Sequence, residues 1–208
     1  MYATVLPSKG AATRELILAR AVELADRSGL DALTIGTLAE AAGMSKSGVF
    51  AHFGSREDLQ LAVLDAAAKI FTDEVFVPAV RERRGLPRLR AILDGWKRRT
   101  LRYGENRGCP IGAALLEFDD QPGPVRERVM GHIAHLLREI ARAVRIAVEQ
   151  GHLHADTDPE QVAFEVHGLM LAFQFEVKLA GVERAVARVE AGVNRLIDSL
   201  IETPSNHD

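Results

Sequence analysis

Apolar residues recur at spacings of three and four along most of the chain, and this pattern constrains the fold more than any other feature. Between residues 14 and 28, for example, Ile17, Ala21, Leu24 and Ala25 share one helical face. Glycine, proline or capping residues separate the periodic stretches. No stretch combines two-residue alternation with flanking turn residues, as a β-strand would. The sequence therefore predicts an all-α protein of about nine helices.

The predicted helices take their limits from residues that favour helix starts and stops. Gly29 and Gly151 suit helix C-termini, while Asp158 with the following proline suits a helix start. A Val77-Pro78 pair should bend or end the fourth helix. The nine helices are expected at 14–28, 35–42, 45–53, 55–76, 87–103, 110–118, 124–150, 159–180 and 183–202.

Composition narrows the class of protein. The 208 residues are 47% apolar and 26% charged, which is typical of a globular chain, and the net charge is −3. Any contact with nucleic acid must therefore come from a local basic patch. A single cysteine excludes an intrachain disulfide and a four-cysteine zinc module. The N-terminus does not resemble a secretory signal, and no membrane-spanning helix is expected, so the expected location is cytoplasmic.

Residues 35–53 have the features of a helix-turn-helix. Ala39 is small enough for two crossing helices to approach, and Gly43 can supply the positive φ of the turn. Leu38 and Val49 are among the apolar residues that can fix both helices to the preceding one. Residues 41–56 include basic side chains but no acidic one, as contact with phosphates requires. An ordinary helical hairpin would share the alanine-to-glycine spacing, but the joint fit of these features favours binding to double-stranded DNA.

The segment TIGTLAEAAGMSKSGVFAHFGSREDL, residues 34–59, resembles the N-terminal signature of TetR/AcrR-type transcriptional regulators, and the similarity covers roughly residues 13–64. Two positions depart from the family pattern. Phe50 stands where tyrosine is usual, and Ala51 stands where polar or basic residues are frequent. A hydroxyl contact to phosphate is therefore lost at the first position, and apolar contact with a thymine methyl group is expected at the second.

The resemblance implies an all-helical homodimer that binds operator DNA and a small-molecule effector and has no catalytic activity. The expected division is a flexible arm (1–8), a helix-turn-helix DNA-binding domain (9–56), and an effector-binding and dimerisation domain (57–208). The helix that begins near residue 55 would connect the last two. The expected function is that of a repressor released from its operator by a small, mostly apolar molecule.

The expected DNA contacts form two groups. Groups at or near helix starts suit phosphates, whereas side chains on the exposed face of the recognition helix suit base edges. The phosphate candidates are Thr34, Thr37, Ser45, Lys46, His52 and Arg56, and the base-reading candidates are Ser47, Gly48, Phe50 and Ala51. A pure capping role accounts equally well for Thr34 and Ser45, and Val49 and Phe53 are assigned to the core.

The last two predicted helices are apolar over most of their circumference, so both sides of the pair must be buried. One side can face its own subunit and the other a two-fold copy, unless a monomer surrounds the pair completely. The expected dimer contacts are Val162, Val166, Phe173, Val189, Val193, Leu196 and Leu200.

The middle of the chain and the helix that follows it hold bulky apolar and polar-tipped residues, which in the resembling family enclose an effector. Core packing explains each of them equally well. The expected ligand-binding residues are Trp96, Tyr103, Cys109, Phe118, Met130, His167, Met170 and Gln174. Because polar groups are few there, the expected ligand is mostly apolar or aromatic.

Three further features allow other interpretations. Residues 81–107 hold ten Lys or Arg against three Asp or Glu, which suits an anionic effector, DNA phosphates or a solvated helix face. His132 and His135 lie one helical turn apart, but no tight ligand spacing accompanies them, so no metal or cofactor is expected. Cys109 precedes a helix start, where a thiol pKa can fall. The alternative function is therefore a small helical enzyme or a redox sensor, although no nucleophile–base motif supports catalysis.

Overall fold

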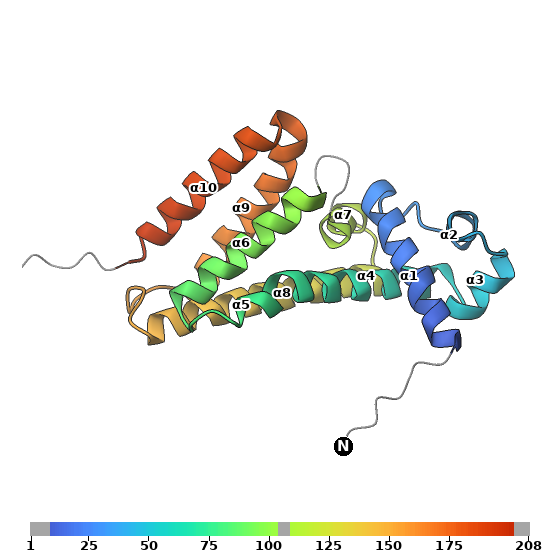
Figure 1. Cartoon of the computed structure of the whole chain (residues 1–208), viewed down its shortest axis with the longest axis horizontal. Helices are drawn as coiled ribbons and strands as arrows, with labels where there is room; N and C mark the ends of the chain where they lie inside the picture. The colour runs from blue at the N-terminus through green and yellow to red at the C-terminus, as the bar shows by residue number, and fades with distance from the viewer. Residues whose placement is uncertain (1–8, 104–108, 202–208) are drawn as a thin grey trace, which may run out of the picture. The chain divides into compact units, whose positions relative to one another are not determined.

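A computed structural model describes residues 9–103 and 109–201, and within these ranges the chain forms helices and loops but no strands (Figure 1). The all-α prediction is therefore confirmed. The predicted arm at residues 1–8 lies outside the described residues. No described helix is both long and apolar enough to cross a membrane.

Ten α-helices and one π-helical segment make up the described fold. They are α1 (Lys9–Ser28), α2 (Ile35–Ala42), α3 (Lys46–Phe53), α4 (Arg56–Phe71), η1 (Thr72–Phe76), α5 (Val77–Ala79), α6 (Leu86–Tyr103), α7 (Pro110–Glu117), α8 (Pro124–Glu149), α9 (Pro159–Ala180) and α10 (Val182–Asp198). Because α4, η1 and α5 follow one another without a break, they form one helical run from residue 56 to residue 79. With that run counted once, the described residues form nine helices, as predicted.

The run 56–79 widens where the sequence predicted a bend or an end. In η1 the hydrogen bonds span five residues, and the N–H of Val77 donates to the carbonyl of Thr72. Pro78 has no N–H to offer to the carbonyl of Glu74, so an ordinary α-helical bond is impossible there. The run then ends at Ala79.

Two helix limits differ from the prediction. α1 begins five residues early, at Lys9, because its first turn carries no large apolar residue that would reveal periodicity. α10 ends at Asp198, and the carbonyl of Leu200 accepts a hydrogen bond from the N–H of His154 at 2.8 Å. This bond to the loop between α8 and α9 holds the chain in a turn where the sequence pattern predicted further helix.

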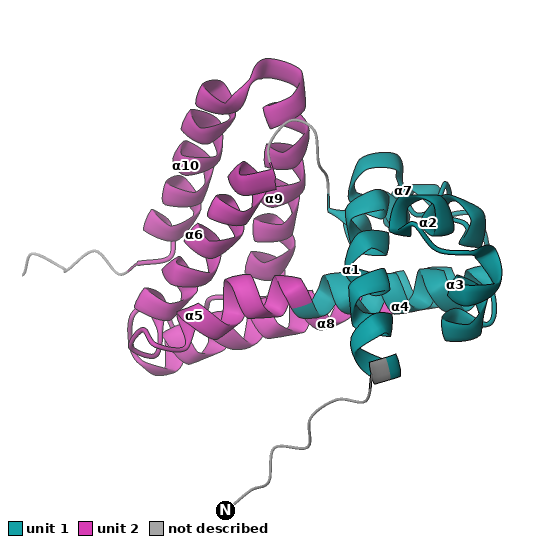
Figure 2. Cartoon of the chain, turned by 45° about the vertical axis from the view of Figure 1, so that its right-hand side comes forward, with its two compact units in different colours: residues 1–69, 109–130 teal, residues 70–108, 131–208 magenta. Residues whose placement is uncertain are grey.

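The described residues divide into two compact units (Figure 2). Unit 1 contains residues 9–69 and 109–130, and unit 2 contains residues 70–103 and 131–201. The helices α4 and α8 each begin in unit 1 and end in unit 2. The predicted boundary after residue 56 differs from this division, because α7 and most of α4 pack with the first three helices.

Unit 2 has an extensive apolar core built from η1, α6, α8, α9 and α10. Its fully buried side chains include Leu89, Ile140, Phe173 and Ile197. The helices α9 and α10 approach closely at Gly192, where a Cβ would stand only 2.8 Å from a methyl group of Leu169. The small residue therefore allows the tight pairing of these two helices.

Candidate nucleic-acid interface and effector site

The α2–turn–α3 segment is a well-capped helix-turn-helix. Thr34 caps α2 by accepting the N–H of Thr37 at 3.1 Å, and Ser45 caps α3 by accepting the N–H of Gly48, also at 3.1 Å. Between the helices Gly43 has φ +64°, a left-handed conformation that glycine adopts at little cost. The N–H of Met44 then donates to the carbonyl of Ala39 at 2.9 Å, which closes the turn.

One face of this motif is buried and the other is exposed. Leu38, Val49 and Phe53 are buried in unit 1, as the sequence predicted for a core face. Phe50 lies on the opposite face of α3 and is 55% exposed. An exposed phenylalanine on a short helix loses hydrophobic stabilisation unless a partner covers it. The exposed residues beside it are Lys46, Ser47 and Ala51.

Lys46 lies against the start of α2. A Cβ at Gly36 would stand 3.4 Å from Cε and 3.7 Å from Nζ of Lys46. The ammonium group is therefore next to the first turn of α2, where backbone N–H groups without helical partners favour an anion. This arrangement forms a small positive site on the exposed side of the motif, and it depends on the absence of a side chain at Gly36.

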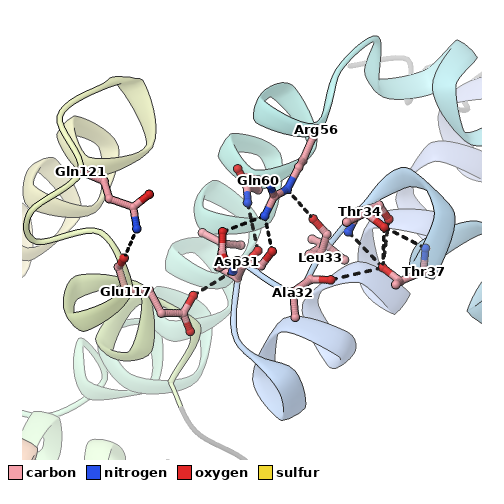
Figure 3. A network of polar contacts seen from close by, with 10 residues as sticks. Asp31, Ala32, Leu33, Thr34, Thr37, Arg56, Gln60, Glu117 and Gln121 are labelled. Atoms are coloured by element: carbon pink, nitrogen blue, oxygen red, sulfur yellow. Dashed lines mark hydrogen bonds and ion pairs between the residues drawn. The ribbon is translucent and has the colours of Figure 1, made fainter.

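Arg56, a predicted phosphate ligand, forms contacts within unit 1 (Figure 3). Its guanidinium forms an ion pair with Asp31 at 2.7 Å and donates to the carbonyls of Asp31 and Leu33, the latter at 3.2 Å. The nearby Gln60, which is buried, donates to the carbonyl of Leu30 at 3.0 Å. Both side chains thus fasten α4 to the loop between α1 and α2.

The two threonine candidates at the start of α2 serve as a reciprocal cap. Thr37 Oγ1 accepts the N–H of Thr34 at 3.0 Å, and the two hydroxyl oxygens lie 3.2 Å apart. Ser45 is similarly engaged, since its Oγ lies 3.1 Å from that of Ser47. The remaining candidates, Gly48 and His52, are partly exposed on α3. The capping interpretation therefore applies to Thr34 and Ser45, whose hydroxyls are still at or near the surface.

The eight predicted ligand-binding residues do not belong to one unit. Cys109, Phe118 and Met130 lie in unit 1, where Phe118 is buried and Met130 is 44% exposed. The other five lie in unit 2, on α6 and α9. Sequence order grouped them because they are close along the chain, whereas the contacts of α7 join its residues to α1 and to the loop before α2.

Unit 2 brings two of the predicted residues together in an aromatic cluster. The ring of Trp96 meets that of Phe71 edge to face, with centroids 5.2 Å apart, and lies 6.3 Å from the ring of His167. Burial lowers the pKa of His167, because the interior disfavours the charged imidazolium. Trp96 and Met170 are buried, and Gln174 is half-buried.

Tyr103 belongs to a charged cluster beside these rings. Its hydroxyl donates to Glu74 Oε1 at 3.1 Å, and Arg102 contacts the same oxygen at 3.2 Å. Arg99 Nε lies 3.1 Å from Glu74 Oε2, and its guanidinium lies over the rings of Phe71 and Tyr103. Sequence analysis did not single out Glu74, Arg99 or Phe71. The one related sequence feature was the basic stretch 81–107, and it did not distinguish the buried Arg99 from the exposed arginines.

A separate cavity of about 70 Å³ lies between α6, α9 and α10. Lys97 is at its edge and forms ion pairs with Glu190 at 2.7 Å and Asp94 at 3.4 Å. Although burial acts to lower the pKa of Lys97, these two carboxylates outweigh it, and the pKa is raised. The cavity is small, and it is also lined by Arg90.

The predicted dimer contacts fall into two groups. Four side chains are buried in the core of their own subunit and are not available to a partner: Val162, Val166, Phe173 and Val189. The other three, Val193, Leu196 and Leu200, are partly exposed on or just after α10. The exposed apolar stripe of α9 has a different register and consists of Phe164, Gly168, Ala172, Phe175 and Leu179. Because α9 is apolar nearly all round, its periodicity cannot distinguish the core face from the outer one.

The cysteine and histidine alternatives receive no structural support. Cys109 precedes α7, and its side chain makes no capping hydrogen bond. No group of three or more His, Cys, Asp or Glu side chains in the described ranges is arranged to hold a metal ion.

Two family descriptions match the chain. Residues 17–63 match "Bacterial regulatory proteins, tetR family", and residues 85–193 match "Tetracyclin repressor-like, C-terminal domain". The second match alone spans more than half of the chain. The first contains the helix-turn-helix with most of α1 and the beginning of α4.

Individual proteins show the same similarity. Transcriptional regulator AcuR of Cereibacter sphaeroides is 27% identical over 160 residues, which are 76% of this chain and 72% of AcuR. The crystal structure of a TetR transcriptional regulator from Chloroflexus aurantiacus is 26% identical with a TM-score of 0.80, and the match covers 92% of this chain and 96% of that one. The structure of AibR with isovaleryl coenzyme A and operator DNA is 22% identical with a TM-score of 0.70, covering 88% of this chain and 97% of AibR.

Proposed function

The chain belongs to the tetR family of bacterial regulatory proteins, and from this we infer that it is a homodimeric repressor that leaves its operator when a small molecule binds to unit 2. The observation that carries the proposal is the exposed face of α3, where Phe50 is 55% exposed beside Lys46 and Ser47. This face is not buried within the subunit. Its shape and charge suit the major groove of DNA.

The proposed DNA contacts follow from the local geometry. Lys46 and the first-turn N–H groups of α2 would bind phosphate, while Ser47, Phe50 and Ala51 would face base edges. Gly48 would allow the backbone of α3 to approach, and the hydroxyls of Thr34, Thr37 and Ser45 would reach phosphate only in addition to their capping bonds. Arg56 would act indirectly, by fixing the start of α4.

Dimerisation is proposed to use the exposed sides of α9 and α10. A groove of about 430 Å³ runs between them. Its lining is apolar at Phe164, Leu169 and Leu196 and charged at Glu165 and Arg195, and it includes Gly168, Gly192 and Ser199. The stripe of α9 described above continues this apolar surface. Two copies related by a two-fold axis would cover each other's grooves, and two recognition helices about 34–36 Å apart would then read two half-sites one helical turn of DNA apart.

The switch is proposed to act through the run 56–79. This run begins three residues after the end of α3 and ends in unit 2, so it is one covalent helical link between the two units. An effector that favours the non-binding conformation by about 1–3 kcal/mol would lower DNA affinity about 5- to 150-fold, and DNA would weaken effector binding by the same factor. AibR offers support from the fold, since its solved structure contains both a ligand and operator DNA.

The proposal is tested by selecting bound sequences from fragmented genomic DNA with the full-length protein. We expect enrichment of a palindromic site whose half-sites are separated by about one helical turn or a multiple of it. The enriched site is then titrated in the presence of small-molecule pools. Failure to enrich any sequence would contradict DNA recognition, and an enriched site that no pool releases would contradict the effector-controlled switch.

A further inference from the structure

Arg99 is a buried guanidinium without hydrogen bonds to the described residues. It is only 7% exposed, and it lies between the rings of Phe71 at 5.5 Å and Tyr103 at 4.6 Å. Although its Nε forms an ion pair with Glu74 Oε2 at 3.1 Å, the contact does not satisfy a hydrogen bond, and both atoms lack a hydrogen-bond partner in the described part of the chain. A buried arginine normally donates several hydrogen bonds, because each lost contact with water is costly.

Among the described residues, the charges around Arg99 do not balance. Arg99 and Arg102 provide two positive charges, and Glu74 is the single carboxylate within ion-pair distance of either among the described residues. Glu74 is held at Oε1 by Arg102 and by the hydroxyl of Tyr103, so its other oxygen alone faces Arg99. A buried ion pair offsets its desolvation only when its hydrogen bonds are well formed. No hydrogen bond joins Arg99 Nε to Glu74 Oε2.

We propose that Arg99 is the recognition residue of the effector site, and that the effector is a small organic acid whose carboxylate binds the guanidinium in competition with Glu74. A second carboxylate would bring the charge of the cluster to zero and accept the N–H groups of Arg99 in a bidentate pair. The rings of Phe71 and Trp96 would contact the apolar part of the same molecule. This inference rests on the proposed function and names the ligand class of its effector site.

The position of Glu74 connects ligand recognition to the proposed switch. Glu74 lies in η1, the widened turn of the run 56–79, and isolated π-helical turns are often found at functional sites. When a ligand carboxylate binds Arg99 in place of Glu74, Glu74 keeps its contacts to Arg102 and Tyr103 and loses its ion pair with Arg99. The ligand therefore removes an interaction that holds η1, and η1 is part of the run 56–79 that links the two units.

The test measures ligand binding to the full-length protein without DNA. The probes are straight-chain carboxylates from propionate to octanoate, benzoate and phenylacetate, each paired with its neutral amide. Trp96 is the only tryptophan and lies in the cluster, so its fluorescence reports binding. We expect at least one acid to bind at least tenfold more tightly than its amide, because hydrogen bonds to a charged partner contribute more than neutral ones.

Three variants distinguish recognition from a structural role. Arg99→Gln should weaken binding of that acid about 10- to 150-fold and leave the amide little changed. Glu74→Gln should strengthen it, because the competing carboxylate is gone. Arg98→Gln is the matched control, since Arg98 is exposed on the same helix and has no partner among the described residues.

The proposal is overturned if no acid is preferred over its amide, or if Glu74→Gln weakens binding of the acid. Both results can be obtained even where Arg99→Gln fails to fold, which thermal unfolding would show. Neither result bears on the proposed DNA recognition, because the selection of bound sequences from genomic DNA tests that proposal separately.

Discussion

The carboxylate of Glu117 accepts the backbone N–H of Asp31 at 2.8 Å, although 86 residues separate them (Figure 3). Glu117 ends α7, and Asp31 lies in the loop that leads into α2. The same carboxylate occupies the space beside Gly29, where a Cβ would overlap it. Unit 1 therefore includes α7, because this contact fastens α7 to the loop before the helix-turn-helix.

Gly29→Ala should destabilise unit 1 for two reasons. Gly29 has φ +84°, which costs an alanine about 1–2 kcal/mol, and the new methyl group would displace Glu117 from Asp31. With the lost hydrogen bond, we expect the free energy of unfolding to fall by about 2–3 kcal/mol in urea denaturation. Gly131→Ala is the control, because nothing lies within 4 Å of that position in α8, and it should be neutral or stabilising. Equal effects of the two changes would contradict this account.

Phe50 and Phe53 provide a matched pair on α3. Phe50 is 55% exposed, whereas Phe53 is 5% exposed and lies in the core of unit 1. Phe53→Ala should lower the free energy of unfolding by about 3–5 kcal/mol. Phe50→Ala should leave it within about 0.5 kcal/mol but change the sequence preference in a selection from random DNA. If Phe50→Ala returned the same site with the same affinity, Phe50 would not face the bases.

Lys46→Ala should weaken binding to cognate and unrelated DNA by similar factors. The ammonium lies beside the first turn of α2, where a phosphate would also meet free N–H groups. We expect the slope of log affinity against log salt concentration to become shallower by about one unit. Lys178→Ala, an exposed lysine of α9, should leave the slope unchanged. A loss confined to the cognate site would instead assign Lys46 to base recognition.

Helices and caps were predictable because their causes are local. The capping roles of Thr34 and Ser45 and the left-handed turn at Gly43 require only neighbouring residues, and the structure confirms them. The ion pairs of Arg56 with Asp31 and of Arg99 with Glu74 each join residues 25 positions apart in the chain. No local sequence pattern predicts them. The contact of Glu117 with Asp31, which joins α7 to unit 1, is long-range in the same way.

The periodicity of apolar residues also could not predict which face of α9 is exposed. A helix that is apolar all round presents several stripes of equal hydrophobicity, and only the packed subunit decides which of them it buries. The structure buries Val166 and Phe173 and leaves Phe164 and Phe175 exposed. The proposed interface therefore moves to the second stripe while the proposal of a homodimer is retained.

Phe164→Asp should convert the proposed dimer to monomer. Phe164 is 67% exposed and lines the groove between α9 and α10, so a carboxylate there would be buried without a partner in the dimer. Sedimentation at micromolar concentration should show a dimer for the unmodified protein and a monomer for the variant. Leu116→Asp is the control, because Leu116 is 62% exposed on α7, and this change should leave the dimer intact. A monomeric unmodified protein would refute the interface.

His167 should make the stability of unit 2 depend on pH. Burial beside Trp96 lowers its pKa below the ordinary value of about 6.5, so the unfolded chain binds this proton more readily than the folded one. The free energy of unfolding therefore rises with pH in this window: the contribution is fully present above about pH 6.5 and is lost as pH falls toward the lowered pKa. His167→Gln should remove that part of the dependence, which denaturation at pH 7.5 and at steps down to pH 5 would measure as the difference between variant and unmodified protein. His135→Gln, which replaces an exposed histidine of α8, is the matched control. A difference curve for His167→Gln that is flat, or that slopes the other way, would show that the imidazole does not enter the interior uncharged.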